Sequence, residues 1–454
     1  MISPARIAAY CTLRDASRPH AELAAAVEHH RLGLTDERDR ALAAEITLGT
    51  LRWRAALDHV IGWAGHRGVE AFDAEVLDLL RMSAYQLLHL DRVPASAIVH
   101  DAVELCRHEG KASASGAINA ILRRISRERD RLPMPDQSDP LEYLTVTLSH
   151  PRWIAARWLE RLGFETACAW MRFNNQPAPV VVRANRLTTS PEQLVDALAA
   201  VGITTEPARY AADALVVTGG HLLASPLATS GQFIVQDESS QLVAALAGVG
   251  PGEVVLDACA APGGKTSQMA ADLGPTGRLV AADLRPRRVR LLATLLKQAH
   301  ADAVQIVTAD LLAGGPFGAI FDCVLVDAPC SGLATLRRDP DVKWRRAESD
   351  LAGHAERQTR MLANAAAMVR PGGRLVYSTC STEPEENDQV VDRFLACHQD
   401  FAIDRPDQSR GWLASGVSAC LDQRGFLRPT PHMHGLEAFF GARLRQVGRA
   451  PAAG

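Results

Sequence analysis

The sequence predicts three parts: an all-helical domain, a small module of helices and strands, and an α/β domain built on a parallel sheet. Apolar residues recur at helical spacing over the first ~130 residues, without the alternation that strands show. The stretch "LPMPDQSDP" then places three prolines among polar residues, which is poor material for regular structure. Beyond residue 231 apolar strand-like runs alternate with helices. We therefore place the domains at residues 1–132, 145–230 and 231–447.

Composition narrows the class of protein. No apolar run in the 454 residues approaches the ~18 that a membrane helix needs, and the first residues lack the order of a secretory signal, so we expect a cytoplasmic protein. Nine cysteines without dense, regular spacing favour reduced thiols. The net charge of −3 excludes a uniformly basic surface. Local clusters such as "AILRRISRERDRL" fit phosphate binding or a solvated helix face.

The helical prediction depends on apolar residues that recur three or four positions apart and therefore lie on one face of a helix. Leu80, Ala84 and Leu87 fall on one helix face, and Ala102 and Cys106 on another. The small module then opens with a helix, "RWIAARWLERLGF", and continues as strand, helix and strand. Its strands are "PVVVRAN" and "ALVVTG". The helix between them begins with a capping box of Ser190 and Gln193.

The third part opens with a strand, a turn of small residues and a helix, in "EVVLDACAAPGGKTSQMAADLG". Gly263 and Gly264 allow a ligand to approach the backbone closely at the start of the helix. The run "GKT" also resembles the end of a phosphate-binding P-loop. That pattern needs a glycine five positions before Gly264, where Cys259 stands, so an ATPase is disfavoured.

Four later strands end on polar residues that carry chemistry. "GRLVAAD" ends at Asp283, twenty residues after Gly263, the spacing at which dinucleotide-type folds place an acid on a ribose. "AVQIVTAD", "CVLVDAP" and "GRLVYSTC" bring Asp310, Asp327 and Cys380. A single acid at such a position is usually a turn residue, but four strand ends should share one crevice. An acid for the ribose without a complete P-loop indicates a nucleoside ligand such as S-adenosylmethionine.

Two cysteines occupy matching settings, Cys330 in "VDAPCSGLATLRRDPDVKW" and Cys380 in "LVYSTCSTEPEEN". If their strands are neighbours, the two thiols lie side by side. Isolated cysteines are most often inert core residues. A thiolate, however, suits attack on carbon 6 of a pyrimidine, which makes carbon 5 nucleophilic enough to take a methyl group.

That chemistry accounts for a pair of thiols, because one forms the covalent adduct and the other helps to break it. Local spacing leaves open which cysteine has which role. Asp327 could hydrogen-bond N3 and the amino group of the base, which favours cytosine.

Four segments resemble motifs of the RNA cytosine-C5 methyltransferases nearly residue for residue: "QDESSQLVAAL", "LDACAAPGGKTSQMA", "DAPCSGLATLRRDPDVKW" and "YSTCSTEPEEN". The whole chain is similar to the Sun/RsmB-type small-subunit ribosomal RNA enzymes of that group. At the amino terminus "PARIAAYCTL" and "GAINAILRRI" are similar to the NusB-like RNA-binding domain of this subfamily.

The resemblance implies a Rossmann-like, S-adenosylmethionine-dependent methyltransferase domain that acts on carbon 5 of a cytosine in 16S ribosomal RNA. It implies that Cys380 attacks, that Cys330 aids release and that Asp327 lies at the donor site, in addition to the catalytic role given to it above. The implied donor site also holds Asp283 at the ribose, Asp310 near the adenine and a loop of Cys259, Ala260, Ala261, Pro262, Gly263, Gly264 and Lys265. We expect a monomer with no metal and no membrane partner.

The carboxyl-terminal segment departs from the family. Its usual His, two variable residues and Asp-Gly-Phe-Phe become "HMHGLEAFF" here, with Glu437 and Ala438 in place of Asp-Gly, so no role carries over. His432 and His434 fit surface or turn positions better than a metal site, because no further ligands are near in sequence.

Three competing functions remain. One is methylation of tRNA, which the NusB-like part disfavours by analogy only. Another is an RNA-binding or antitermination-like factor with a vestigial methyltransferase domain, which the intact Cys330, Cys380 and Asp327 disfavour. A DNA cytosine methyltransferase would have no evident need of Cys380. For an RNA substrate, we expect phosphate contacts from a basic segment made of Arg337, Arg338, Lys343, Arg345 and Arg346.

Overall fold

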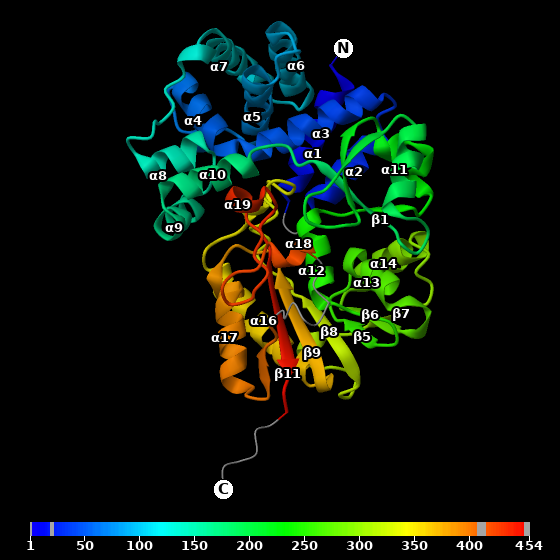
Figure 1. Cartoon of the computed structure of the whole chain (residues 1–454). Coiled ribbons are helices and arrows are strands. Elements are labelled where there is room, and N and C mark those ends of the chain that lie inside the picture. The colour runs from blue at the N-terminus through cyan, green and yellow to red at the C-terminus, as the bar shows by residue number, and fades with distance from the viewer. Residues whose placement is uncertain (1, 19–21, 406–414, 449–454) are drawn as a thin grey trace. The chain divides into compact units, whose positions relative to one another are not determined.

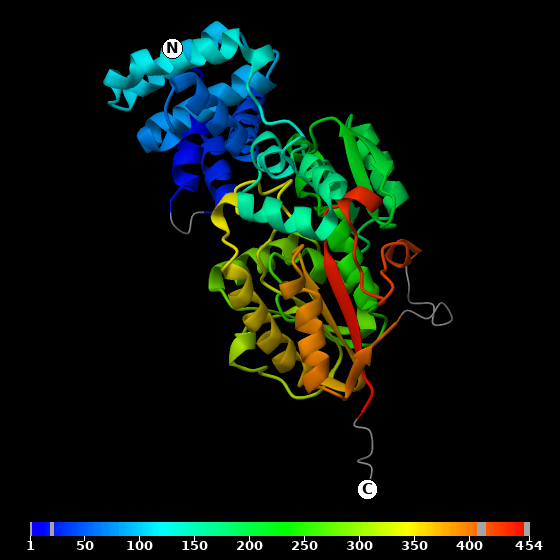
Figure 2. The same ribbon diagram turned by 90° about the vertical axis from the view of Figure 1, so that its left-hand side faces the viewer.

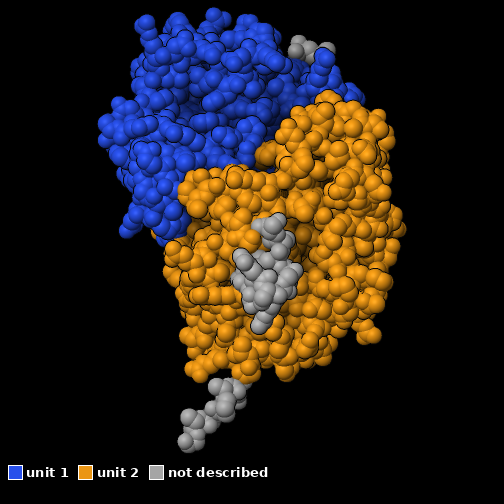
Figure 3. Space-filling view, in the orientation of Figure 1, with its two compact units in different colours: residues 1–177, 336–346 blue, residues 178–335, 347–454 orange. Residues whose placement is uncertain are grey.

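The computed structural model describes residues 2–18, 22–405 and 415–448, and the chain divides into two compact units (Figures 1 and 3). Unit 1 consists of Met1–Pro177 together with Leu336–Arg346. Unit 2 consists of Ala178–Thr335 and Ala347–Gly454. The segment that follows Cys330 in sequence thus belongs in part to unit 1. None of the helices in the described ranges is long and apolar enough to cross a membrane.

Unit 1 is all-helical over its described residues, which confirms the helical prediction for residues 1–132; it also includes the helices of residues 145–177, which we had placed in the small module. Its main helices are α1 (Pro4–Ala16), α2 (Leu23–Leu32), α3 (Glu37–Arg52), α4 (Arg54–Gly65), α5 (Ala74–His89), α6 (Ala95–His108), α7 (Ser115–Arg127), α9 (Arg152–Leu162) and α10 (Phe164–Asn174). Short turns α8 (Pro140–Glu142) and α15 (Val342–Arg345) complete it. The proline-rich stretch "LPMPDQSDP" follows α7 and ends at the first residue of the short turn α8, outside any long helix.

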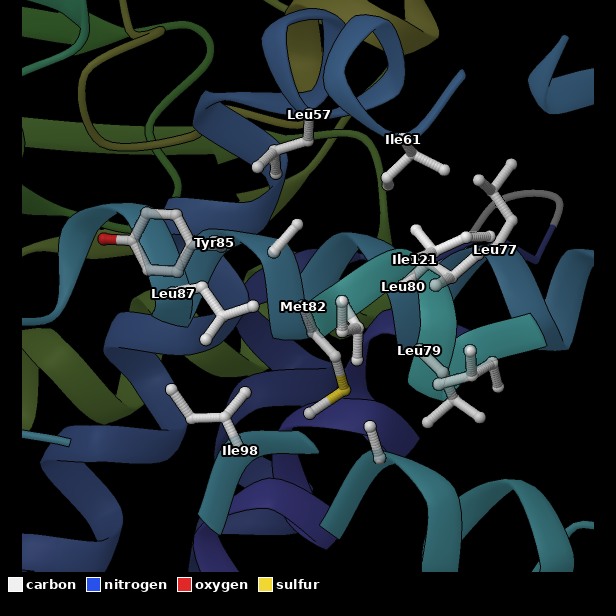
Figure 4. Packing of buried hydrophobic residues seen from close by; sticks show 14 of the residues in the cluster. Leu57, Ile61, Leu77, Leu79, Leu80, Met82, Tyr85, Leu87, Ile98 and Ile121 are labelled. Atoms are coloured by element: carbon white, nitrogen blue, oxygen red, sulfur yellow. The ribbon is translucent and has the colours of Figure 1, made fainter. Parts of the chain in front are cut away.

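The core of unit 1 follows from the helical periodicity. The predicted face of α5 is buried, with Leu80 and Ala84 fully enclosed and Leu87 nearly so. Figure 4 shows α5 side chains packed with Leu57 of α4 and Ile121 of α7, which belong to the same apolar cluster. Burial of such side chains is the main stabilising term of a helical bundle.

Unit 2 begins with a four-stranded antiparallel sheet in the order β2-β3-β1-β4. Its elements are β1 (Val180–Ala184), α11 (Pro191–Ala200), β2 (Thr204–Pro207), β3 (Ala214–Gly219) and β4 (Phe233–Val235). Both predicted strands and the helix between them are confirmed, and the capping box of Ser190 and Gln193 is present at the start of α11. We did not predict β2, a largely exposed edge strand, or β4, which has three residues and follows residue 230.

The larger sheet of unit 2 has seven strands in the order β10-β11-β9-β8-β5-β6-β7 (Figures 1 and 2). The strands are β5 (Val254–Asp257), β6 (Arg278–Asp283), β7 (Gln305–Thr308), β8 (Phe321–Asp327), β9 (Val369–Thr379), β10 (Phe401–Ile403) and β11 (Phe440–Gln446). The five predicted strands, β5 to β9, pair in parallel. The two unpredicted strands differ, because β11 runs antiparallel to β9 and to β10.

Helices cover both faces of this sheet, as the sequence predicts for buried parallel strands. They are α12 (Glu238–Ala247), α13 (Gly264–Leu273), α14 (Pro286–Gln298), α16 (Asp350–Ala366) and α17 (Asp388–Cys397), with short turns α18 (Ser415–Ser418) and α19 (Pro431–His434). Successive residues of β8 join different cores: Val324 packs with residues of α16 and α17, and Leu325 with residues of α12 and α13. This alternation confirms a Rossmann-like sheet with a core on each side.

We predict that Leu80→Ala lowers the free energy of unfolding of unit 1 by about 2–5 kcal/mol, because the cluster around this side chain can close the cavity only in part. Leu32→Ala is the matched control, since the Leu32 side chain is 72% exposed. Urea unfolding of the full chain, followed by amide exchange in α5, measures both. Equal effects of the two substitutions would contradict this assignment of the core.

Candidate active site

The carboxyl ends of β8 and β9 bring the two predicted thiols together. These strands are neighbours in parallel register, with Asp327 opposite Ser378. Cys330 and Cys380 follow directly, and their sulfur atoms are 3.2 Å apart. Both side chains are partly exposed. The expectation that the thiols lie side by side is therefore confirmed, whereas their separate roles stay predictions.

A buried carboxylate links the two cysteine segments. Glu386, which is 0% exposed, accepts hydrogen bonds from the backbone N–H of Ser331 (2.8 Å) and from its hydroxyl (2.5 Å). The hydroxyl of Ser381 donates to the same carboxylate at 2.5 Å, and Gln358 adds an amide donor at 3.0 Å. Ser331 and Ser381 each follow a cysteine directly. One carboxyl group thus binds both of the serines that follow the cysteines, and a buried polar group needs such partners.

The surroundings of Cys330 disfavour its thiolate form. The hydrogen bond with Cys380 raises the pKa of the Cys330 thiol well above its usual range, and burial and the charge of Glu386 act in the same direction. Cys330 therefore keeps its proton at neutral pH. A thiol at hydrogen-bond distance stabilises negative charge on its neighbour.

Asp327 and Lys265 form an ion pair beside the cysteines. The Lys265 ammonium donates to Asp327 Oδ2 at 2.7 Å, and the Ser378 hydroxyl donates to Oδ1 at 2.7 Å. Burial opposes the charge of Lys265, but the charges of Asp327, Asp237 and Cys380 more than compensate and raise its pKa. Lys265, Asp327 and Cys380 therefore form one electrostatic cluster.

The predicted donor loop connects β5 to α13. Gly263 has a φ of 115°, in the region that favours glycine. A Cβ at Gly263 would come within 2.9 Å of Leu292, and one at Gly264 within 3.3 Å of Gln236. The absent side chains thus make room for protein neighbours, which is a different reason from the ligand approach that we expected.

Two predicted acids lie along the same edge. Asp283, at the end of β6, accepts a hydrogen bond from the backbone N–H of Ala261 (3.2 Å), which ties β6 to the donor loop. Asp310 follows β7 and accepts from the Leu312 N–H at 2.9 Å. Each carboxylate oxygen has two lone pairs, so both acids can accept further hydrogen bonds from ligand hydroxyl or amino groups.

A residue that we did not predict from the sequence also holds the donor loop in place. Arg183, on β1 of the small sheet, is buried and donates to the carbonyl of Gly264 (2.7 Å) and to the hydroxyl of Ser267 (2.7 Å). Burial lowers the pKa of its guanidinium to about 10, but the group stays charged at neutral pH. The sequence feature that could have indicated this role is the lone arginine in the apolar strand "PVVVRAN". The signal for Glu386 was the Cys-Ser pair that both cysteine segments share.

The basic segment after Cys330 requires one correction. The expectation that Lys343 contacts RNA phosphates is wrong, because its side chain is 1% exposed. Its ammonium donates to the carbonyls of Arg52 (2.9 Å) and Ser149 (2.6 Å) inside unit 1. Arg337 donates to the carbonyl of Pro177. Phosphate contacts by Arg337, Arg338, Arg345 and Arg346 stay a prediction.

His434, near the carboxyl terminus, has a local structural role. His434 Nδ1 accepts the backbone N–H of Thr430 at 3.0 Å, and its ring packs edge-on against Tyr210. Within the described residues, no group of three or more His, Cys, Asp and Glu side chains is arranged to hold a metal ion.

This edge of the sheet fits a nucleoside methyl donor. Carboxylates at the ends of β6 and β7 suit a ribose and an adenine amino group, and the start of α13 offers backbone N–H groups to a carboxylate. When bound, S-adenosylmethionine would supply an electrophilic methyl group. The ion pair of Lys265 and Asp327 links the predicted donor loop to the end of β8, the strand that precedes Cys330.

Comparison with known families gives three matches along the chain. The family described as "16S rRNA methyltransferase RsmB/F" matches residues 244–445. The NusB family matches residues 3–127, and the "Methyltr_RsmF/B-like, ferredoxin-like domain" matches residues 150–222.

Individual proteins agree with these matches. The chain is 34% identical over 415 residues to the "Probable ribosomal RNA small subunit methyltransferase B" of Bacillus subtilis, covering 91% of this chain and 92% of the relative. The crystal structure of PH0851 has a TM-score of 0.82 at 24% identity, covers 98% of this chain and 99% of its own, and shows the fold alone. A "Methyltransferase Homolog Protein" of Pyrococcus horikoshii has a TM-score of 0.57 at 27% identity, covering 69% of this chain and 100% of its own.

We predict that Asp257→Asn removes a pH dependence of stability. Burial raises the pKa of Asp257, at the end of β5, to about 7, above its unfolded value. The folded state therefore binds this proton more tightly, and the stability it gives is lost as pH rises through about 7. From pH 5 to 8 the variant should gain about 2 kcal/mol relative to wild type. Urea unfolding followed by amide exchange in β5 measures this, and a constant difference would refute it.

We predict that Glu386→Ala separates the two thiols. Without the shared acceptor, Ser331 and Ser381 lose their common partner, the hydrogen bond between the sulfur atoms weakens, and the pKa of Cys330 falls. Alkylation of Cys330 by iodoacetamide at pH 7.5 should become at least about tenfold faster, the factor for one pKa unit. Glu356→Ala, at an exposed site on α16, should leave the rate unchanged. Equal rates in both variants would show that Glu386 does not position the thiols.

Proposed function

Because this chain belongs to the RsmB/F family of S-adenosylmethionine-dependent 16S rRNA methyltransferases, we propose that it methylates carbon 5 of a cytosine in small-subunit ribosomal RNA through a covalent cysteine adduct. One observation carries the proposal: two sulfur atoms 3.2 Å apart at the ends of neighbouring strands, beside the donor loop. A methyltransferase that attacks with an already nucleophilic nitrogen or oxygen atom has no need of this pair.

Cys380 forms the adduct. As a thiolate it adds to carbon 6 of the base, and the electron pair displaced from the 5,6 double bond makes carbon 5 nucleophilic. Cys330, which keeps its proton, donates a hydrogen bond to the Cys380 sulfur and stabilises the thiolate before attack. Carbon 5 would then bond to the methyl group as the sulfur–methyl bond of the donor breaks, with the electron pair of that bond staying on the departing thioether sulfur.

Cys330 also aids release. Loss of the carbon 5 proton to solvent restores the 5,6 double bond as the bond between carbon 6 and sulfur breaks, and Cys380 leaves as a thiolate. The Cys330 thiol, 3.2 Å away, donates its proton in a hydrogen bond to the departing sulfur. Without this donor the elimination is slow and the adduct persists.

Asp327 and Lys265 select the base. Addition of a thiolate to carbon 6 places negative charge on the ring of the base, and the Lys265 ammonium stabilises charge in this region. The Asp327 carboxylate accepts a hydrogen bond from the cytosine amino group, for which uracil has no equivalent donor. Ser378 and Lys265 fix the orientation of this carboxylate.

The remaining parts of the chain serve the RNA. We propose that residues 1–132 and 145–230 are RNA-binding domains and that residues 231–447 form the methyltransferase domain. A ribosomal RNA substrate also favours a cytoplasmic location, and we propose that the protein acts as a monomer.

Cysteine substitutions test the two roles. Cys380→Ala should abolish methyl transfer to unmodified small-subunit RNA, because no adduct forms. Cys330→Ala should accumulate a protein–RNA adduct that migrates slowly on a denaturing gel. Cys397→Ala, at an exposed site on α17, is the matched control and should behave as wild type. Normal turnover by Cys380→Ala, with no adduct from Cys330→Ala, would reverse the assignment, and a product other than 5-methylcytosine would refute the function.

A further inference from the structure

A cavity of about 720 Å³ lies within unit 1. It is lined by residues of α1, α3, α4, α5 and α15, so one wall comes from the segment that follows Cys330. The size is typical of sites for nucleotide-sized ligands. The proposed mechanism gives this space no role.

The wall from α15 is rigidly held. The Trp344 indole N–H donates to the carbonyl of Leu51 at 2.6 Å, and Lys343 donates to the carbonyls of Arg52 and Ser149. The Trp344 ring therefore faces the cavity in a fixed position. A preformed aromatic surface is a common feature of sites that bind single-stranded nucleic acid.

One arginine of the cavity has no carboxylate partner. The other four are paired: Arg14 with Glu75 at 2.9 Å, Arg18 with Asp15 at 3.0 Å, Arg81 with Asp58 at 2.6 Å and Arg345 with Asp341 at 3.2 Å. The guanidinium of Arg54, the first residue of α4, makes no hydrogen bond or ion pair with the described residues. Its guanidinium lies over the Trp344 ring, 5.5 Å from the centroid.

The surroundings of Arg54 favour the binding of an anion. Burial lowers the pKa of this guanidinium, and the positive charge of Arg81 lowers it further, although Asp58 and Asp78 act in the opposite direction. Asp78 is itself shared between Arg14 and Arg81. A half-buried guanidinium with unused donors matches the oxygen atoms of a phosphate group.

We propose that this cavity binds a phosphate group of the RNA substrate, with Arg54 as the phosphate contact and Trp344 beside the adjoining nucleotide. The inference rests on the proposed function, because it takes the substrate to be ribosomal RNA. Binding there would anchor the RNA on the α15 segment, whose sequence continues from the loop that carries Cys330. Arg54 would then determine RNA affinity rather than the chemical step.

Arg54→Gln in the full-length protein tests this contact. Loss of the charged guanidinium and its hydrogen-bond donors should raise KM for unmodified small-subunit RNA about tenfold and leave kcat unchanged. The slope of log Kd against log salt should fall by about one. Arg38→Gln is the matched control, because it removes an exposed charge from α3 outside the cavity and should change neither value. Arg54→Lys, which keeps the charge, should lose less affinity.

A second measurement needs no substitution and so does not depend on the folding of a variant. RNA carrying 4-thiouridine should cross-link under ultraviolet light to peptides that contain Trp344 or Arg54. Equal affinities of Arg54→Gln and Arg38→Gln, or cross-links confined to other segments, would overturn the proposal.

Free phosphate is the alternative source of the same chemistry. If inorganic phosphate stabilises wild type but not Arg54→Gln while both bind RNA equally, the cavity takes free phosphate and the proposal fails. The product base is determined on the same samples. Wild type that forms no 5-methylcytosine would refute the proposed function, whereas equal RNA affinities would refute this inference alone.

Discussion

The arrangement at the site depends on one buried carboxylate. Glu386 accepts hydrogen bonds from Ser331 and Ser381, and each of these serines follows a cysteine at the end of a neighbouring strand. The parallel register of β8 and β9 brings the two segments to the same edge, and the shared acceptor brings their sulfur atoms to 3.2 Å. The register of the sheet determines only which residues of β8 and β9 lie opposite one another. A fully satisfied, buried acceptor fixes side chains more closely, because any displacement leaves a charge without donors.

A second constraint acts on the donor loop and works in the same way. Arg183 lies on the small antiparallel sheet but donates to Gly264 and Ser267 at the start of α13. The small sheet therefore supports the donor site directly. Arg183 thus holds the start of α13, and Glu386 holds the two segments that carry Cys330 and Cys380. Both side chains are buried, and each makes several hydrogen bonds to polar groups of the protein.

The sequence was sufficient for those features that periodicity and local motifs encode. The helical bundle, five parallel strands and the meeting of Cys330 with Cys380 follow from apolar spacing and from the rule that strand ends share one edge. Partners distant in sequence could not be predicted. We expected Lys343 to lie at the surface because its segment is rich in arginines. The carbonyl groups that accept its hydrogen bonds, however, lie 291 and 194 residues away in the sequence. The strands β2 and β4 were missed because one is polar and exposed and the other has three residues.

The central claim is that Cys380 bonds to carbon 6 of a cytosine while Cys330 stands beside it. RNA containing 5-fluorocytidine tests this most directly, because fluorine at carbon 5 cannot leave as a proton does and the adduct cannot eliminate. Mass spectrometry of the digested complex locates the bond. The account predicts a methylated fluorocytidine attached to the peptide that contains Cys380. Attachment to the Cys330 peptide, or no attachment to either, would contradict it.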